Sequence, residues 1–326
     1  MESFLRPYSQ RPAPAVPHTF HGTVPQFGER TPFVDNIRVT RRGRTALAIA
    51  VGTVCVAVAA QIPASATAAP AAHHGSGTAS IAQRASISVG AFDDTAYDDT
   101  YYKDAIGKTG QALKDSLHRI ISSTQTGKLT YSQVWDALKN TDEDPANSAN
   151  VILLYSGRSQ SKNSNGGNPD DWNREHVWAK SHGDFGTATG PGTDIHHLRP
   201  ADVSVNSTRG NKDFDDGGTE VGEAPGNYTD GDSFEPRDAD KGDVARMILY
   251  MAVRYDGDDG FPDLEPNDKV DNGSQPYIGR LSVLKEWSKQ DPPSAFEQHR
   301  NQVIFDKYQH NRNPFIDHPE WVDQIW

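Results

Sequence analysis

The hydrophobic pattern predicts helices along most of the chain after residue 100. Apolar residues recur there every three or four positions, which places them on one face of a helix. The most regular stripe, with Val244, Ile248, Met251 and Tyr255, is expected to pack in the core. Helices are predicted on this basis over residues 102–123, 129–138, 241–255, 278–289 and 294–308.

Strand patterns are fewer and shorter. Residues 150–155 form an apolar run of the length of a buried strand. Residues 159–171 are rich in Ser, Asn, Gly and Pro, and residues 256–273 are acidic and rich in Gly, which predicts two exposed loops. Together with the helices, these segments predict a mainly helical α+β domain with few strands.

The first 68 residues differ from the rest of the chain. Four arginines between Arg38 and Arg44 precede an apolar run over residues 46–60, and small residues with Ala-x-Ala motifs follow. This order is typical of a secretory signal peptide, so we expect a secreted protein with no stable membrane association after cleavage. The long segment before the arginines is unusual for a signal peptide. We hypothesise that translation starts near Val39 and that the part upstream is a misassigned extension.

Composition then separates a linker from the folded part. Residues 69–100 begin with mostly Ala, Ser, Gly and His and end in an acidic stretch, which predicts a flexible linker. The folded domain is predicted to span residues 101–326, and we expect it to be a monomer. The single cysteine, Cys55, lies in the predicted signal peptide. Disulfides, thiolate catalysis and Cys-bound zinc are therefore excluded from the mature chain.

The charge balance is acidic. The chain holds 32 Lys and Arg against 44 Asp and Glu, a net charge of −12. Removing residues 1–68 takes away seven basic and three acidic residues, which leaves 25 basic and 41 acidic residues and a net charge of −16. Such a protein has no long-range attraction to a polyphosphate. Nucleic-acid binding would therefore need a local basic groove and a bound cation.

Chemically active side chains are concentrated in residues 172–214. The pattern there predicts a strand that ends over 175–178, a Gly-rich loop, a second strand over 193–198 and a helix. Pro200 suits the first position of that helix, and Gly210 suits its end. On the helix, Asp202, Asn206 and Arg209 would share one face because they are four and three residues apart.

This predicted unit would bring Glu175 and His176 close to Asn206 and Arg209. A neutral imidazole can take a proton from water at neutral pH. Oxygen ligands from Glu and Asn suit a hard cation such as Mg²⁺, and an arginine can pair with two phosphate oxygens. These are the parts that phosphodiester hydrolysis needs, because the cation neutralises charge on the phosphoryl group.

Three elements of this region resemble a known family. They are Glu-His-Val-Trp from Glu175, Asp-x-His-His-Leu-x-Pro from Asp194, and Val-Asn-x-x-Arg-Gly-Asn from Val205. They are similar to the bacterial endonuclease I family of secreted and periplasmic nucleases, part of the His-Me finger (ββα-metal) superfamily. The resemblance continues through residues 235–238, 241–255 and 311–320, so it covers about residue 101 to the C-terminus. It implies an endonuclease I-like nuclease domain, with a ββα-metal core surrounded by helices.

The resemblance also implies roles for three residues. His176 would be the general base, and Glu175 and Asn206 would hold one divalent metal ion, with Mg²⁺ expected and Mn²⁺ or Ca²⁺ as alternatives. The implied activity is endonucleolytic hydrolysis of DNA, and of RNA as a second substrate, to 5′-phosphate products. One departure is Ala179, at a position where the family often has proline.

Supporting roles are assigned from the residues themselves. Arg209 is expected to pair with a substrate phosphate. His197 and Asp202 are expected to support the metal and base residues from behind. His196 and His197 are adjacent on the predicted strand, so their side chains should face opposite sides. His182 is expected to be a loop residue, and the histidines do not form an HExxH zinc motif.

Two other functions fit the composition. One is a secreted metal-dependent phosphatase or phosphodiesterase that acts on small molecules. The other is a non-enzymatic calcium-binding surface module, suggested by the acidity and by Asp256-Gly-Asp-Asp-Gly260. That segment lacks the ligand spacing of an EF-hand, which favours a solvated acidic loop. Neither function explains why the Glu-His, His-His and Asn-x-x-Arg elements occur together.

Overall fold

The computed structural model describes Tyr97 and residues 100–326. The predicted signal peptide (residues 1–68) and nearly all of the predicted linker (residues 69–100) lie outside the described residues. Within the described part, none of the helices combines the length and the hydrophobicity that a membrane span requires.

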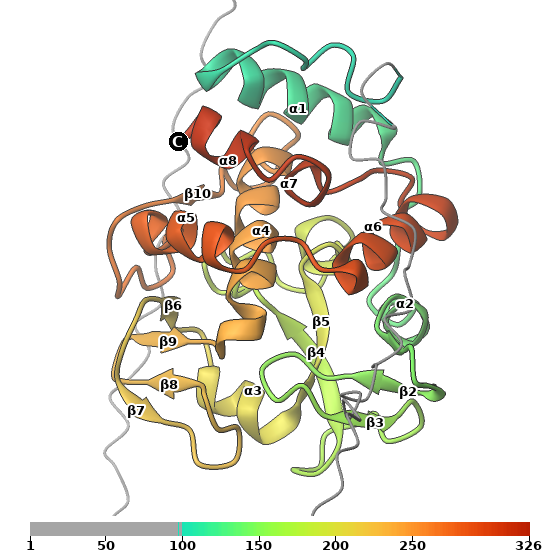
Figure 1. The fold of residues 1–326 in the computed structure, drawn as a ribbon, viewed down its shortest axis with the longest axis vertical. Helices are drawn as coiled ribbons and strands as arrows, with labels where there is room; N and C mark the ends of the chain where they lie inside the picture. The colour runs from blue at the N-terminus through green and yellow to red at the C-terminus, as the bar shows by residue number, and fades with distance from the viewer. Residues whose placement is uncertain (1–96, 98–99) are drawn as a thin grey trace, which may run out of the picture. The chain divides into compact units, whose positions relative to one another are not determined.

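Helices form most of the regular structure, and in Figure 1 most of them lie in the upper half of the view, with most of the small strands below. This confirms the predicted α+β class. The predicted helix over 102–123 begins later than expected, because residues 101–107 form turns. The helices are α1 (Gly110–Thr124), α2 (Val134–Thr141), α3 (Val203–Arg209), α4 (Asp238–Arg254), α5 (Leu281–Gln290), α6 (Ala295–Lys307), α7 (Pro314–Asp317) and α8 (Trp321–Ile325).

The strands form four small sheets. β1 (Glu143–Asp144), β2 (Asn147–Ile152) and β3 (Ser159–Ser161) make an antiparallel sheet in that order. β4 (Trp172–His176) and β5 (Leu198–Asp202) make a two-stranded antiparallel sheet. The third sheet has the order β6-β9-β8-β7, and β10 pairs in parallel with β11. Their bounds are β6 (Asp213–Phe214), β7 (Thr219–Glu220), β8 (Tyr228–Thr229), β9 (Ser233–Glu235), β10 (Glu265–Pro266) and β11 (Tyr277–Ile278).

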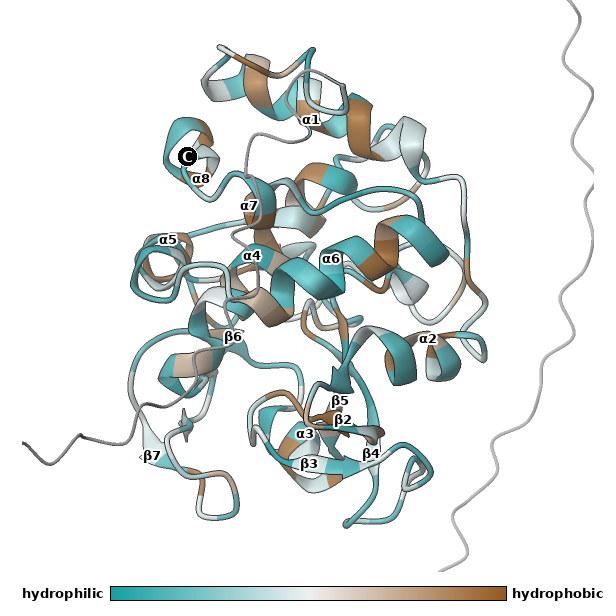
Figure 2. Ribbon diagram, turned by 45° about the vertical axis from the view of Figure 1, so that its right-hand side comes forward, coloured by the Kyte–Doolittle hydropathy of each residue, from teal (hydrophilic) through white to brown (hydrophobic). Residues whose placement is uncertain are grey.

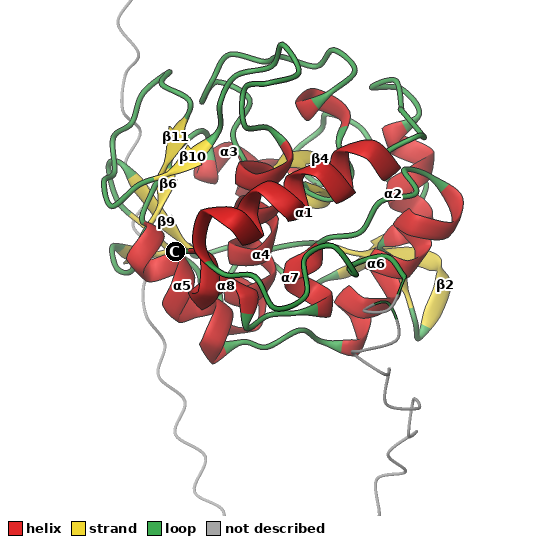
Figure 3. Cartoon of the chain, turned by 90° about the horizontal axis from the view of Figure 1, so that it is seen from above, coloured by secondary structure: helices red, strands yellow, loops and turns green. Residues whose placement is uncertain are grey.

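Helix α4 is the centre of the main hydrophobic core. All its residues from Asp240 to Arg254 are buried, and it packs against α1, α5 and α7. Figure 3 shows α1 lying across α4 when the molecule is seen from above. The apolar residues of α1 form separate bands along the helix in Figure 2, because only one face turns toward the core. The predicted stripe on α4 is therefore confirmed as core packing.

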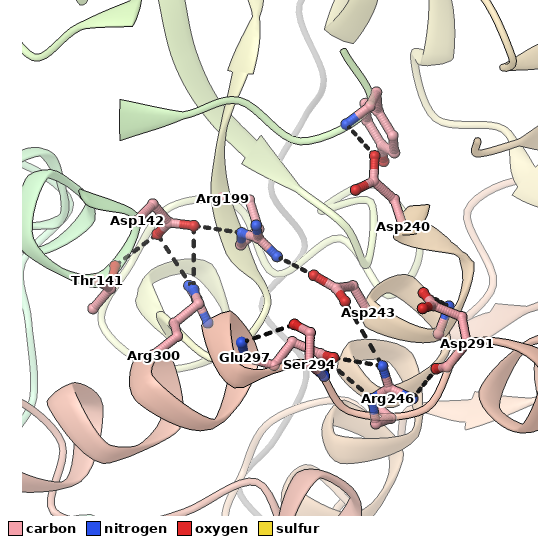
Figure 4. Close-up of polar contacts among 12 residues, drawn as sticks. Thr141, Asp142, Arg199, Asp240, Asp243, Arg246, Asp291, Ser294, Glu297 and Arg300 are labelled. Atoms are coloured by element: carbon pink, nitrogen blue, oxygen red, sulfur yellow. Dashed lines mark hydrogen bonds and ion pairs between the residues drawn. The ribbon is translucent and has the colours of Figure 1, made fainter. Parts of the chain in front are cut away.

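A second hydrophobic cluster lies between α2, α6 and the β4–β5 sheet. It contains Trp172 of β4, Leu198 of β5 and Ile304 of α6, all fully buried. A buried ionic network joins the end of α2, β5, α4 and α6 (Figure 4). The network consists of Asp142, Arg199, Asp243, Arg246, Glu297 and Arg300.

The predicted second strand over 193–198 is wrong. Those residues form a short 3-10 turn and further turns, and the strand begins at Leu198. Pro200 stands inside β5, opposite Arg174, and does not open a helix. A two-stranded sheet has only edge strands, which tolerate a residue without an N–H donor. The carbonyl oxygen of Pro200 instead accepts a hydrogen bond from the amide of Leu154 at 2.8 Å.

Candidate active site

The antiparallel pairing of β4 and β5 positions the acidic and histidine side chains. Glu175 stands opposite Arg199, and His176 stands opposite Leu198 at the end of β4. Helix α3 follows β5 directly and packs on both strands. Two strands and the next helix thus form one continuous unit that carries Glu175, His176 and Asn206.

Helix α3 is fixed at both ends by local chemistry. The carboxylate of Asp202 is its N-cap and accepts hydrogen bonds from the amides of Ser204 (3.0 Å) and Val205 (3.3 Å). Asp202 therefore precedes the helix, one residue earlier than the first-turn position expected for it. The helix ends at Gly210, whose φ of 62° is readily adopted only without a Cβ. These two residues set the orientation of Asn206 between them.

Glu175, His176 and Asn206 line one open cleft of about 430 Å³. Arg174 and Lys180 are its basic residues, while Glu175 is its only acidic one. This matches the local basic groove that an acidic protein would need to bind a polyphosphate. The lining residues are Tyr131, Trp135, Gly166, Asn173, Arg174, Glu175, His176, Ala179, Lys180, Ser181, Asn206, Gly210 and Asn211.

The imidazole of His176 is held in one orientation. Its Nε2 lies 3.1 Å from the carbonyl oxygen of Gly192, so Nε2 carries the proton and Nδ1 keeps a lone pair. The ring is only 6% exposed and stacks on Tyr131 at 5.8 Å between centroids. Burial, with the nearby His197 ring, lowers the pKa of His176 to about 3. The ring is therefore neutral at neutral pH, as a proton acceptor must be.

Two side-chain contacts of Glu175 fall on the same carboxylate oxygen. Its Oε1 accepts a hydrogen bond from the hydroxyl of Tyr155 at 2.8 Å and lies 3.2 Å from the guanidinium of Arg209. Oε2 takes part in neither contact. Burial raises the pKa of Glu175, while Arg209 and Tyr155 lower it, and burial has the larger effect. A nearby cation would favour the charged form.

Asn206 also keeps an oxygen for a ligand. Its Nδ2 donates a hydrogen bond to Oδ1 of Asn173 at 2.7 Å, and its own Oδ1 takes no part in that bond. A carboxylate oxygen and an amide oxygen in one cleft are hard donors of the kind that Mg²⁺ and Ca²⁺ prefer. The donor set of Glu175 and Asn206 thus fits the expected metal.

Arg209 lies behind the cleft and is not one of its lining residues. Its side chain is completely buried and donates to the carbonyl oxygens of His176 (2.9 Å) and Val177 (2.7 Å). The guanidinium also lies 4.6 Å from the ring centroid of Phe214. Arg209 therefore holds the end of β4, where the sequence had suggested a phosphate contact.

The remaining histidines point in different directions. His197 lies behind His176, with ring centroids 5.6 Å apart, and its Nε2 contacts the carbonyl oxygen of Pro191 at 2.8 Å. His196 faces the core and lies 4.4 Å from the ring of Tyr250. The opposite orientation was predicted, but both residues lie in a turn and not on a strand. His182 lies in a turn and is buried, with contacts to backbone carbonyls.

Three aromatic residues of the site were missed by the sequence analysis. Tyr155 comes from the end of the predicted strand 150–155 and holds Glu175. Tyr131 and Trp135 come from the predicted helix 129–138, and their ring centroids lie 3.5 and 4.0 Å from Cζ of Arg174. No sequence motif marks these residues, and Tyr131 and Trp135 reach the cleft through the packing of α2 against β5.

An acid, an imidazole and an amide share one cleft beside basic side chains, and these are side chains that a hydrolase site could use. Comparison with known families gives the class more closely. The family model for Endonuclease I matches residues 109–320, and the chain therefore belongs to the endonuclease I family.

Two relatives are similar over about two thirds of the chain. The chain is 72% identical over 222 residues to a protein of Bacillus subtilis (strain 168) named extracellular ribonuclease. That match covers 68% of this chain and 76% of the relative. The chain is also 70% identical over 224 residues to a protein of the same name from Bacillus amyloliquefaciens. This second match covers 69% of this chain and 77% of the relative. Family and relatives together support a secreted nuclease.

Proposed function

We propose that this protein is a secreted endonuclease that hydrolyses phosphodiester bonds in RNA and DNA with a divalent metal ion and leaves 5′-phosphates. One observation carries the proposal. Glu175, His176 and Asn206 line the same cleft, and each keeps one acceptor atom outside its internal contacts. Both relatives are named extracellular ribonuclease, so we include RNA as a proposed substrate beside DNA.

The unit β4–β5–α3 is the ββα-metal core in this proposal. This unit consists of a strand, an antiparallel strand and a helix, in that order along the chain. The proposed base, His176, comes from the first strand, and the amide ligand, Asn206, comes from the helix. Oε2 of Glu175 and Oδ1 of Asn206 would hold Mg²⁺ or a similar ion. When bound, such an ion neutralises charge on the phosphoryl group and on the leaving oxygen.

His176 acts as the general base. Its Nδ1 accepts a proton from the attacking water, while the bond from Nε2 to Gly192 keeps the ring from rotating. His197 lies behind this ring and helps to fix its position. The lowered pKa of His176 keeps its ring unprotonated at neutral pH, so the lone pair of Nδ1 is present there.

Arg174 and Lys180 hold the substrate backbone in the cleft. Arg174 is oriented by Tyr131, whose carbonyl oxygen accepts a hydrogen bond from its Nη1 at 2.5 Å. Arg209 is a positioning residue, because it bonds the backbone of His176 and the carboxylate of Glu175 together. Asp202 positions Asn206 by capping α3.

Supercoiled plasmid and structured RNA, incubated with the secreted protein in Mg²⁺ or in chelator, test the proposal. We expect both substrates to be cut with Mg²⁺ and neither with chelator, and the products to carry 5′-phosphates. His176→Ala should lower the rate about 10²–10⁴-fold, since that is the usual contribution of a general base. His310→Ala, at an exposed position, is the matched control and should cut normally.

Two outcomes would overturn the proposal. Cleavage that persists in His176→Ala would show that another group is the base. Hydrolysis of a chromogenic phosphate ester with intact plasmid and RNA would indicate the small-molecule phosphatase.

A further inference from the structure

A second group of metal-ligating side chains lies away from the cleft. His118 comes from α1, while Asp256 and Asp258 come from the acidic loop that follows α4. One ligand atom from each of the three lies within 4.8 Å of the other two. Asp256 and Asp258 belong to the Asp-Gly segment that the sequence predicts to be a solvated loop. The fold places His118, from a helix far away in the sequence, next to this segment.

The proton position on His118 is fixed from outside this group. Its Nδ1 lies 2.8 Å from the carbonyl oxygen of Val253, and since a carbonyl only accepts, Nδ1 carries the proton. In the neutral ring, Nε2 is then a lone pair. Metal-binding histidines commonly donate their other N–H to a backbone carbonyl in this way. His118 is 7% exposed, so its ring is held by the surrounding protein.

Nε2 of His118 faces a carboxylate. Asp258 Oδ2 lies 3.2 Å from Nε2, and Asp256 Oδ2 lies 3.4 Å from Nδ1. Either a proton on Nε2 or a metal ion between the two atoms makes this contact favourable, and metal binding distinguishes the two. Two ligand atoms bound to one Zn²⁺ at about 2.0–2.2 Å each are separated by about 3.3–3.5 Å in tetrahedral geometry, close to the distance found here.

We infer that His118, Asp256 and Asp258 bind a divalent metal ion, Zn²⁺ or Mn²⁺, at a site separate from the cleft. The choice follows from the ligands. Imidazole suits Zn²⁺ and carboxylates suit Mn²⁺, whereas Ca²⁺ and Mg²⁺ prefer oxygen ligands alone. Asp258 is the most exposed of the three, with 65% of its side chain accessible, so the ion reaches the site from solvent and keeps water ligands.

The ion would stabilise the segment that supports the general base. Phe261 lies in the acidic loop, directly after Gly260, and packs against Tyr255 with ring centroids 5.6 Å apart. It also lies directly on Gly190, where an added Cβ would be 2.3 Å from the ring. Gly190 begins the turn Pro191–Thr193, and Gly192 in that turn accepts the hydrogen bond from His176. A fixed loop therefore keeps this turn in place.

Metal binding separates this inference from a plain ion pair. The protein is stripped with chelator and dialysed against Zn²⁺, Mn²⁺, Ca²⁺ or Mg²⁺ in turn, and bound metal and Tm are measured. The variants are His118→Gln and Asp258→Asn, with Asp263→Asn as the control because it makes the same change at an exposed position of the same segment. Asn206→Ala removes a proposed ligand of the cleft metal only, so it shows whether a loss of binding comes from the cleft or from the His118 site.

We expect the unsubstituted protein, Asp263→Asn and Asn206→Ala to bind Zn²⁺ or Mn²⁺ at this site and to gain Tm. His118→Gln and Asp258→Asn should bind at least tenfold more weakly and lose the gain. Equal binding and equal Tm in all variants would overturn the inference, as would the absence of Zn²⁺ and Mn²⁺ binding in the unsubstituted protein. Asp258 is exposed, so its substitution does not endanger the fold.

Discussion

Two buried carboxylates of this protein have the same kind of partners and different tasks. Asp142 lies in the ionic network between α2 and α6, and Glu175 lies beside the cleft. Both are at most 2% exposed, and both contact arginine. Asp142 is enclosed on both oxygens: Oδ1 accepts from Arg199, Oδ2 accepts from the hydroxyl of Thr141, and Arg300 bonds to both.

Glu175 differs because its contacts with Tyr155 and Arg209 fall on one oxygen. A buried acceptor whose bonding capacity is filled by the protein holds elements together. A buried acceptor with an oxygen left over can bind a ligand that the protein does not itself supply. The number of occupied acceptor atoms, and not burial or charge, therefore distinguishes the structural carboxylate from the proposed catalytic one.

The largest effect is expected for Glu175→Gln. Removing a residue that only hydrogen-bonds to a metal ligand already costs about 10–100-fold, so removing a proposed ligand should lower nuclease activity by about 10²-fold or more. The free energy of unfolding should fall less than in Asp142→Asn, because the substitution takes the carboxylate from one buried arginine, Arg209, whereas Asp142 pairs with two. Plasmid cleavage and urea unfolding measure the two. A large loss of stability with normal activity would reverse the comparison.

Asp142→Asn should do the opposite. It leaves Arg199 and Arg300 buried without their shared carboxylate, and breaking a buried ion pair typically costs about 3–5 kcal/mol. Activity per folded molecule should not change, since Asp142 is not among the residues that line the cleft. Urea unfolding followed by tryptophan fluorescence gives the stability. An unchanged unfolding midpoint would show that the network is not structural.

Acid should weaken the region behind the cleft next. Burial lowers the pKa of both His196 and His197 to about 4 in the folded protein, against about 6.5 in the unfolded chain. A lowered pKa contributes stability that is complete above pH 6.5 and is lost as pH falls toward 4. From pH 7 to pH 5 the free energy of unfolding of the protein should fall by roughly 3–4 kcal/mol because of these two histidines.

Urea unfolding at several pH values tests this effect. His196→Gln should remove about half of the pH dependence if the two histidines contribute equally. A pH dependence that His196→Gln leaves unchanged would assign the effect to other groups.

The smallest effect is expected for Arg174→Met. It removes one positive charge from the cleft and keeps an apolar stem against Tyr131 and Trp135. We expect KM for RNA to rise about tenfold with kcat nearly unchanged, and the slope of log affinity against log salt to fall by about 0.7. Lys103→Met makes the same charge change at an exposed position outside the cleft and serves as control. Equal effects of the two substitutions would show that only net charge matters.

Local pattern was enough for several parts of the fold. The hydrophobic period is a local feature, and α4 and α6 both lie within a few residues of the bounds that it predicts. The second strand was misplaced because Pro200 is typical of helix starts and only its edge position in a two-stranded sheet allows it in β5. Helix propensity and strand pairing compete at such a residue, and the partner strand decides.

The sequence by itself determined the family, the α+β class and the group of residues from Glu175 to Asn206, because these depend on residue types at fixed short spacings. Only the tertiary structure decided which atoms of those residues remain available. It buried Arg209 behind β4, turned Tyr155 onto one oxygen of Glu175, and brought His118 to a loop 138 residues further along the chain. Such contacts join segments far apart in sequence, and packing alone sets the distances between them.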